Sequence, residues 1–228
     1  MIATAMTRLA EPPFTPASAT FADLWERLGR VPLDRILLDP PPGTAVERDV
    51  IARQDAADKR LCELVDGVLV EKPMGQYESR LAALIIHLLY TYLDQNDLGI
   101  VLAPDGPMRL SAGSVRLPDV AFVSWTRFPG QRVADDAILD CAPDLAIEIL
   151  SKGNTRTEME RKLVEYFRAG TKLVWYIDPK ARNAVAYTAP DQGRPCPEDG
   201  ALDASAVLPG FALSLRELFA RAAGAPQE

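Results

Sequence analysis

A glutamate stands inside a run of apolar residues that has the pattern of a buried strand. Residues 143–151 read P-D-L-A-I-E-I-L-S, and the glutamate is Glu148. A carboxylate in such a strand costs free energy unless it is protonated, ion-paired or bound to a metal. Glu148 is therefore either a paired or protonated structural residue or part of a charged site built into a sheet.

Two aspartates that follow prolines are candidates to share a site with Glu148. Asp119 lies in a second expected strand, residues 116–124, and Asp144 precedes Glu148 on the same strand. Asp144 and Glu148 would be separated by roughly 13 Å of strand, which is too far to share a metal, whereas neighbouring strands lie only about 5 Å apart. If the two strands pair, Asp119 and Glu148 converge and would bind a hard divalent cation such as Mg²⁺ or Mn²⁺.

A lysine on the next segment could complete this group. The sequence predicts a helix that is capped near Thr155, runs to Ala169 and returns alongside the strand. At about 1.5 Å of rise per residue, Lys162 lies level with Glu148 and beside the core rather than within it. Its ammonium could reach the carboxylates, or it could be a surface lysine paired with Glu158.

A second helix is expected from Gln76 to Asn96, with apolar residues at helical spacing. Glu78 falls on the apolar stripe in the first turn, where the helix dipole favours a carboxylate and where a site residue would also fit. His87 is the only histidine and lies off that stripe. A histidine-based triad or a histidine-rich metal site is therefore nearly excluded.

The remaining pattern alternates between helices and strands. We expect a short helix at 21–28, a hairpin at 61–70 around Asp66-Gly67, strands at 99–103, 107–110 and 173–177, an edge strand at 183–188, a polar loop at 190–206 and a closing helix at 213–222. This order predicts an α/β fold in which helices flank a central mixed β-sheet. Residues 1–58 are expected to form an N-terminal extension with a short helix and Pro-rich linkers, 59–222 one domain, and 223–228 a tail.

The composition is that of a soluble globular protein. Lys and Arg number 25 and Asp and Glu 32, which gives a net charge of −7. This charge argues against a general nucleic-acid coat protein but leaves room for a local basic groove. Three scattered cysteines are typical of reduced thiols in a cytoplasm. The longest uncharged apolar stretch, 81–93, is too short to span a bilayer, so we expect a cytoplasmic protein with no membrane partner.

Several motifs occur in an order that is specific to one known family. They are E-L-V-D-G at 63–67, P-D at 118–119, P-D-L-A-I-E-I-L-S at 143–151, a helix with Lys162 and Tyr166, A-G at 169–170, V-W-Y-I-D-P at 174–179 and V-L-P-G-F at 207–211. Over roughly residues 60–220 the chain resembles the Uma-two family of predicted restriction endonucleases, which belongs to the PD-(D/E)XK nuclease superfamily. The resemblance implies a restriction-endonuclease-like core and Mg²⁺-dependent (or Mn²⁺-dependent) hydrolysis of DNA, for which a homodimer would suit symmetric cutting.

The resemblance also implies roles for individual residues. Asp119 would be the first acidic metal ligand and Glu148 the second. The E-x-K pattern of the superfamily places its lysine at position 150, where this chain has Leu150. The resemblance suggests that this catalytic lysine has moved onto the next helix as Lys162, with Lys152 as the lesser candidate.

Many members of the family carry a histidine early in the first helix, where this chain has Glu78 or a neighbour. By the same resemblance, Glu78 could serve as a third metal-binding carboxylate. Two other functions stay open at this point. A degraded nuclease fold would bind nucleic acid or a protein partner without cutting, and a metal-dependent hydrolase could act on something other than DNA.

Overall fold

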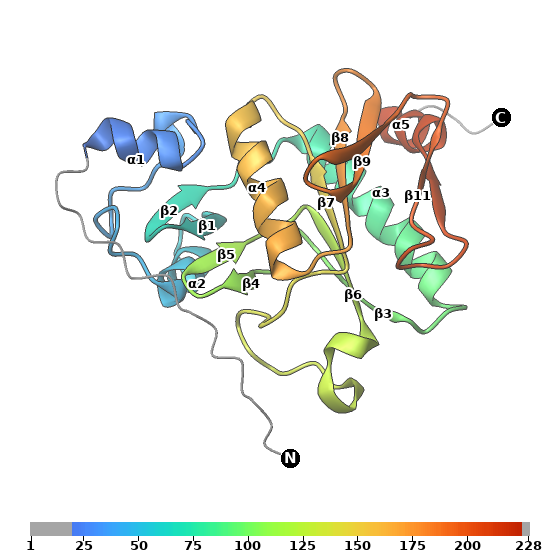
Figure 1. The fold of residues 1–228 in the computed structure, drawn as a ribbon, viewed down its shortest axis with the longest axis horizontal. Coiled ribbons are helices and arrows are strands. Elements are labelled where there is room, and N and C mark those ends of the chain that lie inside the picture. The colour runs from blue at the N-terminus through green and yellow to red at the C-terminus, as the bar shows by residue number, and fades with distance from the viewer. Residues whose placement is uncertain (1–19, 225–228) are drawn as a thin grey trace, which may run out of the picture.

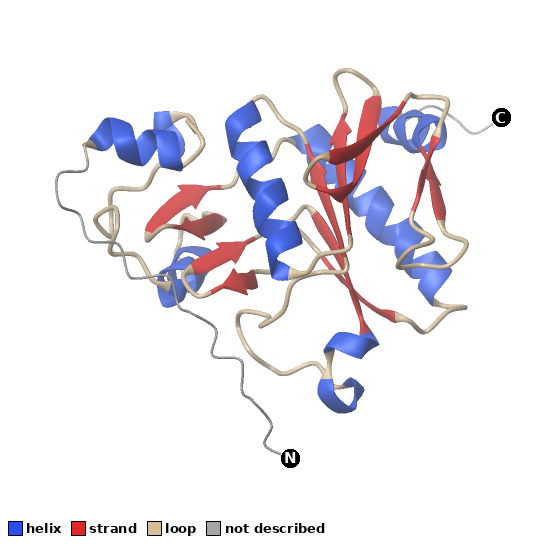
Figure 2. Cartoon of the chain, viewed as in Figure 1, coloured by secondary structure: helices blue, strands red, loops and turns tan. Residues whose placement is uncertain are grey.

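Six strands form the central sheet of an α/β fold in the computed structural model, which describes residues 20–224 (Figures 1 and 2). From one edge to the other they are β10 (Gln192–Cys196), β9 (Asn183–Ala189), β8 (Leu173–Asp178), β7 (Leu145–Ile149), β6 (Val120–Ser124) and β3 (Gly99–Leu102). Strands β7 and β8 run parallel, and the other neighbouring pairs run antiparallel. The sheet is therefore mixed, as the sequence predicts, and the strand that carries Glu148 lies inside it.

A second, four-stranded sheet was not predicted. Its order is β2 (Val68–Glu71), β1 (Cys62–Val65), β5 (Ser114–Arg116) and β4 (Met108–Ser111). The expected strand at 116–124 is in fact two strands, because the chain leaves β5 and enters β6 through Leu117–Asp119. Asp119 thus lies where the chain passes from the small sheet to the large one.

The hairpin of β1 and β2 forms where the sequence predicts it. Asp66 and Gly67 both have positive φ angles, 49° and 72°, as a two-residue hairpin turn of this twist requires. The segment before the hairpin contains α1 (Phe21–Arg27) and α2 (Glu47–Asp55), and the residues between these helices pack on β1 and β2. Residues 1–19 of the expected extension and 225–228 of the expected tail lie outside the described residues. The domain boundaries therefore stay a prediction.

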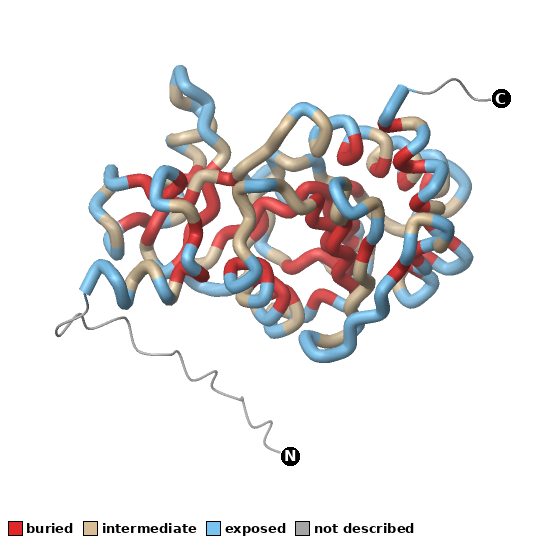
Figure 3. Tube along the Cα trace, turned by 90° about the horizontal axis from the view of Figure 1, so that it is seen from above, coloured by how far each residue is buried: buried red, intermediate tan, exposed pale blue. Residues whose placement is uncertain are grey.

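Helices cover both faces of the large sheet. Two of them, α3 (Gln76–Leu93) and α5 (Leu215–Ala223), pack on the face that carries Leu145, Ile147 and Ile149. The opposite face, which carries Ala146, is covered by α4 (Arg156–Ala169), and this helix lies between the two sheets (Figure 1). Figure 3 shows the buried segments gathered in the interior and the exposed ones around the outside. No helix within residues 20–224 is long and apolar enough to cross a membrane.

The ends of α4 follow from its sequence. The Thr155 hydroxyl accepts a hydrogen bond from the Glu158 backbone, and the Glu158 carboxylate accepts one from the Thr155 backbone. Gly170 ends the helix with φ 99°, in the left-handed region that favours glycine. The Glu158 carboxylate also binds the buried Arg35 guanidinium in two hydrogen bonds, which ties the N-terminal segment to α4.

Two expectations about the C-terminal part are wrong. Strand β9 is not at the edge of the sheet, because β10 pairs along its outer side. Residues 190–206 are not a polar loop, since they contain β10 and β11 (Ala201–Asp203), which pairs with β12 (Ala212–Ser214). The sequence of β10, Q-G-R-P-C, carries Gly and Pro and has no apolar alternation, so only its pairing with β9 identifies it as a strand.

Candidate active site

Strands β6 and β7 bring Asp119 and Glu148 together. Val120 pairs with Ile147 in antiparallel register, so the next residues outward on each strand, Asp119 and Glu148, lie across from each other. Oδ2 of Asp119 accepts a hydrogen bond of 2.6 Å from the backbone N–H of Ile149. Both carboxylates are buried, with 5% and 4% of their surface exposed. The two strands do pair, which is the condition under which the sequence brings Asp119 and Glu148 together.

The ammonium of Lys162 lies beside Glu148, as helix rise predicts. Its Nζ is 3.2 Å and 3.3 Å from the two carboxylate oxygens of Glu148. Lys162 is not a surface lysine paired with Glu158, whose partner is Arg35. It is also not beside the core but within it, with only 2% of its surface exposed.

A third carboxylate, Glu63 of β1, belongs to the same group and was missed by sequence reasoning. Its Oε1 lies 2.9 Å from Nζ of Lys162, and its Oε2 accepts a hydrogen bond of 2.8 Å from Arg116. The signal that could have revealed it is the one that revealed Glu148. Glu63 stands between buried apolar residues in the strand C-E-L-V, and only 1% of it is exposed.

Lys72 is a second lysine of the group, and it does not stand inside an apolar strand that would reveal it in the sequence. It follows β2 and precedes Pro73, in a context typical of an exposed loop lysine. Nevertheless it is buried, and its Nζ lies 2.8 Å from Oδ1 of Asp119. We call the six buried charged residues that meet here the buried charge cluster: Glu63, Lys72, Arg116, Asp119, Glu148 and Lys162. Its three carboxylates and three cations cancel in formal charge.

The cluster shifts the pKa values of Glu148 and Glu63 in opposite directions. Burial raises the pKa of Glu148, and although Lys162 offsets part of this effect, the charges of Asp119 and Glu63 add to it. Burial would also raise the pKa of Glu63, but the charges of Lys162 and Arg116 outweigh it and hold that pKa at about 2. Glu63 is therefore a fixed anion, and Glu148 takes up a proton more readily than an ordinary glutamate.

The two donors to Glu148 are held in their protonated forms. Burial alone would lower the pKa of Lys162, but the charges of Glu148 and Glu63 raise it above its ordinary value. The Tyr166 hydroxyl donates a hydrogen bond of 2.6 Å to Oε1 of Glu148. Burial and the neighbouring carboxylates raise the pKa of Tyr166, so it stays a donor.

Asp144 lies outside the cluster, as strand geometry predicts. Its carboxylate is fully buried and accepts a hydrogen bond of 2.9 Å from the backbone N–H of Ser124. It also forms ion pairs with Arg127 at 3.2 Å and Lys172 at 3.0 Å. These contacts tie the start of β7 to the end of β6, which is a structural role.

Glu78 is not brought into the cluster. It lies in the first turn of α3, which covers the face of the sheet opposite to Lys162, and no contact joins it to Asp119 or Glu148. Among residues 20–224, no group of three or more His, Cys, Asp or Glu side chains is arranged to hold a metal. The expected third carboxylate ligand is therefore not placed with the other two.

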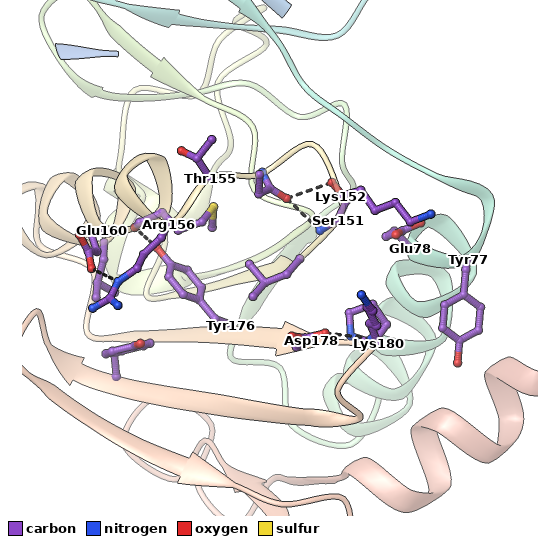
Figure 4. Close-up of a pocket in the computed structure, with 16 residues that line it drawn as sticks. Tyr77, Glu78, Ser151, Lys152, Thr155, Arg156, Glu160, Tyr176, Asp178 and Lys180 are labelled. Carbon is purple, nitrogen blue, oxygen red and sulfur yellow. Dashed lines mark hydrogen bonds and ion pairs between the residues drawn. The ribbon is translucent and has the colours of Figure 1, made fainter. Parts of the chain in front are cut away.

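Glu78 instead lines a cavity of about 750 Å³ at the ends of β7 and β8. Tyr176, Asp178 and Lys180 line it as well (Figure 4). So does Lys152, the lesser candidate for the catalytic lysine, which is exposed. The cluster carboxylates do not line this cavity. It adjoins the cluster, because Tyr176 pairs across the strands with Glu148.

Comparisons with known proteins bear on the family and the fold. The family model Uma2, described as "Putative restriction endonuclease", matches residues 50–216. A solved structure from Anabaena variabilis, described as "a putative nuclease belonging to DUF820", is 19% identical, with a TM-score of 0.65 over 76% of this chain and 97% of that chain. This likeness confirms the nuclease-like α/β fold. No curated protein matches the chain. Since the family model covers well over half of the sequence, the protein belongs to the Uma2 family.

Proposed function

We propose that this protein is an endonuclease that hydrolyses DNA phosphodiester bonds with Mg²⁺ or Mn²⁺. The family and the nuclease-like fold support a nuclease. The observation that carries the finer proposal is the meeting of Asp119, Glu148 and Lys162 from two adjacent strands and the following helix. Two carboxylates can hold a divalent cation that activates water, and a lysine beside them can stabilise negative charge that develops on a phosphate.

The donor set fits a hard divalent cation. Mg²⁺ is commonly bound through one or two carboxylates while it keeps several waters, and Asp119 and Glu148 supply two such groups. When bound there, the ion would polarise a phosphate oxygen and lower the pKa of an attacking water. Glu78 is not part of this proposal, because it lies on the other helix.

Three residues around the two carboxylates would stabilise charge that develops in the reaction or hold other groups of the site in position. Lys162 stays an ammonium and would stabilise negative charge that develops on the phosphoryl oxygens. Glu63 would act as a positioning residue, since it holds both Lys162 and Arg116 in place. Tyr166 would fix the orientation of the Glu148 carboxylate through its hydrogen bond.

The neighbouring cavity offers a path for a nucleic-acid strand. The ammonium groups of Lys152 and Lys180 line it, and neither forms an ion pair within residues 20–224. Such lysines are suited to contact phosphates without reading sequence. The cluster itself is closed, so a scissile phosphate would reach Glu148 only after side chains around the cluster move aside. The homodimer stays a prediction.

Supercoiled plasmid incubated with the protein tests this function. We expect nicked and linear products with Mn²⁺ or Mg²⁺ and none with EDTA, because the carboxylates alone do not activate water. Asp119→Asn should abolish the products. Binding of DNA without cleavage under any metal would instead indicate a degraded nuclease module. Cleavage of RNA or nucleotides but not of plasmid would indicate a different hydrolase.

A further inference from the structure

The ammonium of Lys72 lies in a position that a metal cation could occupy. Its Nζ is surrounded by three oxygens: Oδ1 of Asp119 at 2.8 Å, the Leu117 carbonyl at 2.6 Å and the Pro104 carbonyl at 3.3 Å. Carboxylate and carbonyl oxygens are also the ligands that hard divalent cations prefer. Only 3% of the Lys72 side chain is exposed, so this charge is a fixed part of the buried charge cluster.

Both carboxylate oxygens of Asp119 already have partners. One of its oxygens contacts Lys72, and the other accepts the hydrogen bond from Ile149. The formal charges of the cluster already cancel, since Lys72, Arg116 and Lys162 face three carboxylates. Arg116 also reaches Glu165, but Arg161 pairs with that carboxylate. A divalent ion added here would leave two uncompensated buried positive charges, which is costly.

Lys72 is the cluster cation that can leave most readily. Arg116 and Lys162 each contact two carboxylates, whereas within residues 20–224 Lys72 contacts one carboxylate, that of Asp119. The Lys72 backbone is fixed by a hydrogen bond of 2.8 Å to the Leu61 carbonyl, so its departure needs a movement of the side chain alone. A lysine has a flexible four-carbon stem that permits such a movement.

We propose that Lys72 is a built-in competitor of the divalent cation: it holds the cation position on Asp119 and must withdraw before a metal binds. This inference rests on the proposed function. It makes Lys72 the residue that sets the metal affinity of the site. The metal-free protein is thereby stabilised, and metal binding is weakened by the loss of the Lys72–Asp119 pair. When the Lys72 ammonium withdraws, the cluster loses one positive charge, which offsets half of the double positive charge of the metal ion.

Mn²⁺ titration of Lys72→Met by calorimetry tests the proposal. The variant keeps the length of the stem and removes the charge, so its Mn²⁺ affinity should exceed that of the wild type by at least about tenfold, the lower range for a close charge pair. Mn²⁺ should also raise the melting temperature of the variant more than that of the wild type. Lys152→Met, an uncharged variant of an exposed lysine, should bind Mn²⁺ like the wild type.

Lys72→Gln provides a second variant if Lys72→Met does not fold, because glutamine can still donate to the Leu117 carbonyl. Wild-type binding of Mn²⁺ with equal or weaker binding by both variants would overturn the inference and leave the proposed function standing. If the Lys72 variants bind Mn²⁺ as tightly as the wild type but no longer cleave DNA, the charge of Lys72 acts in catalysis instead. Absence of Mn²⁺ binding in all of these proteins would overturn the proposed metal site and the inference with it.

Discussion

Replacing Glu63 with Gln is expected to lower the free energy of unfolding by about 3 kcal/mol at pH 7. The reason is that the folded protein holds the pKa of Glu63 at about 2, compared with an ordinary value of 4.5, and each tenfold change in a protonation equilibrium corresponds to about 1.4 kcal/mol. A neutral glutamine at this position could not balance the charges of Lys162 and Arg116, which would stay buried.

Glu148→Gln is expected to cost little or to stabilise the metal-free protein. Its pKa is raised by burial and by the neighbouring carboxylates, so the folded state disfavours its charge. A neutral amide removes that cost, can still accept the hydrogen bond from Tyr166, and leaves Lys162 paired with Glu63. Two buried glutamates that share one lysine should therefore respond to the same substitution in opposite ways.

The pH dependence of stability follows from the directions of these shifts. The pKa of Glu63 is lowered by folding, so its contribution is fully present above about pH 4.5 and is lost as the pH falls toward about 2. The difference in unfolding free energy between wild type and Glu63→Gln should shrink across that window. Urea unfolding of wild type, Glu63→Gln and Glu148→Gln between pH 7 and pH 3 measures it. A Glu148→Gln variant that loses as much stability as Glu63→Gln would contradict this description of the cluster.

Lys162→Met is expected to reduce DNA cleavage at least about a hundredfold, the scale for losing one preorganised electrostatic donor. It should also destabilise the protein, because Lys162 is buried and both Glu63 and Glu148 depend on it. The double variant Glu63→Gln/Lys162→Met removes one charge of each sign and should recover part of the lost stability without recovering cleavage. Rates are compared at a temperature where circular dichroism shows each variant folded.

Lys152→Met is the matched control for this experiment. Lys152 lies three residues beyond the end of β7 and borders the neighbouring cavity, where it contacts none of the cluster carboxylates. Its loss should weaken DNA binding modestly and leave the cleavage rate of bound DNA within a few-fold. If Lys152→Met abolished cleavage and Lys162→Met did not, the catalytic lysine would have stayed beside the strand rather than moving to the helix.

The sequence predicts that part of the site which depends on local regularity. A carboxylate inside an apolar strand identified Glu148, strand spacing selected Asp119 over Asp144, and helix rise placed Lys162 level with Glu148. Glu63 was equally accessible to this reasoning, because it also stands inside an apolar strand.

The rest of the cluster depends on contacts between elements that no local pattern records. Arg116 ends the three-residue strand β5, which is too short to show a period, and Lys72 follows a hairpin as many exposed lysines do. Arg116 is buried where the small sheet meets α4, whose Glu165 it contacts. Lys72 is buried against Asp119 and the carbonyls of Leu117 and Pro104. The expectation that Glu78 joins the metal-binding carboxylates does not follow from its place on an apolar stripe. The stripe indicates which face of α3 is buried, but not which face of the sheet α3 covers.

Titration of Mn²⁺ into wild type, Glu148→Gln and Asp144→Asn tests most directly whether the carboxylates of β6 and β7 form a cation site. Asp144 is a matched control, since it is an equally buried acid at the start of the same strand and pairs with Arg127 and Lys172 outside the cluster. We predict one Mn²⁺ per chain in wild type and in Asp144→Asn, and binding at least about tenfold weaker in Glu148→Gln. Equal affinity in wild type and Glu148→Gln would contradict the assignment of Glu148 as a metal ligand.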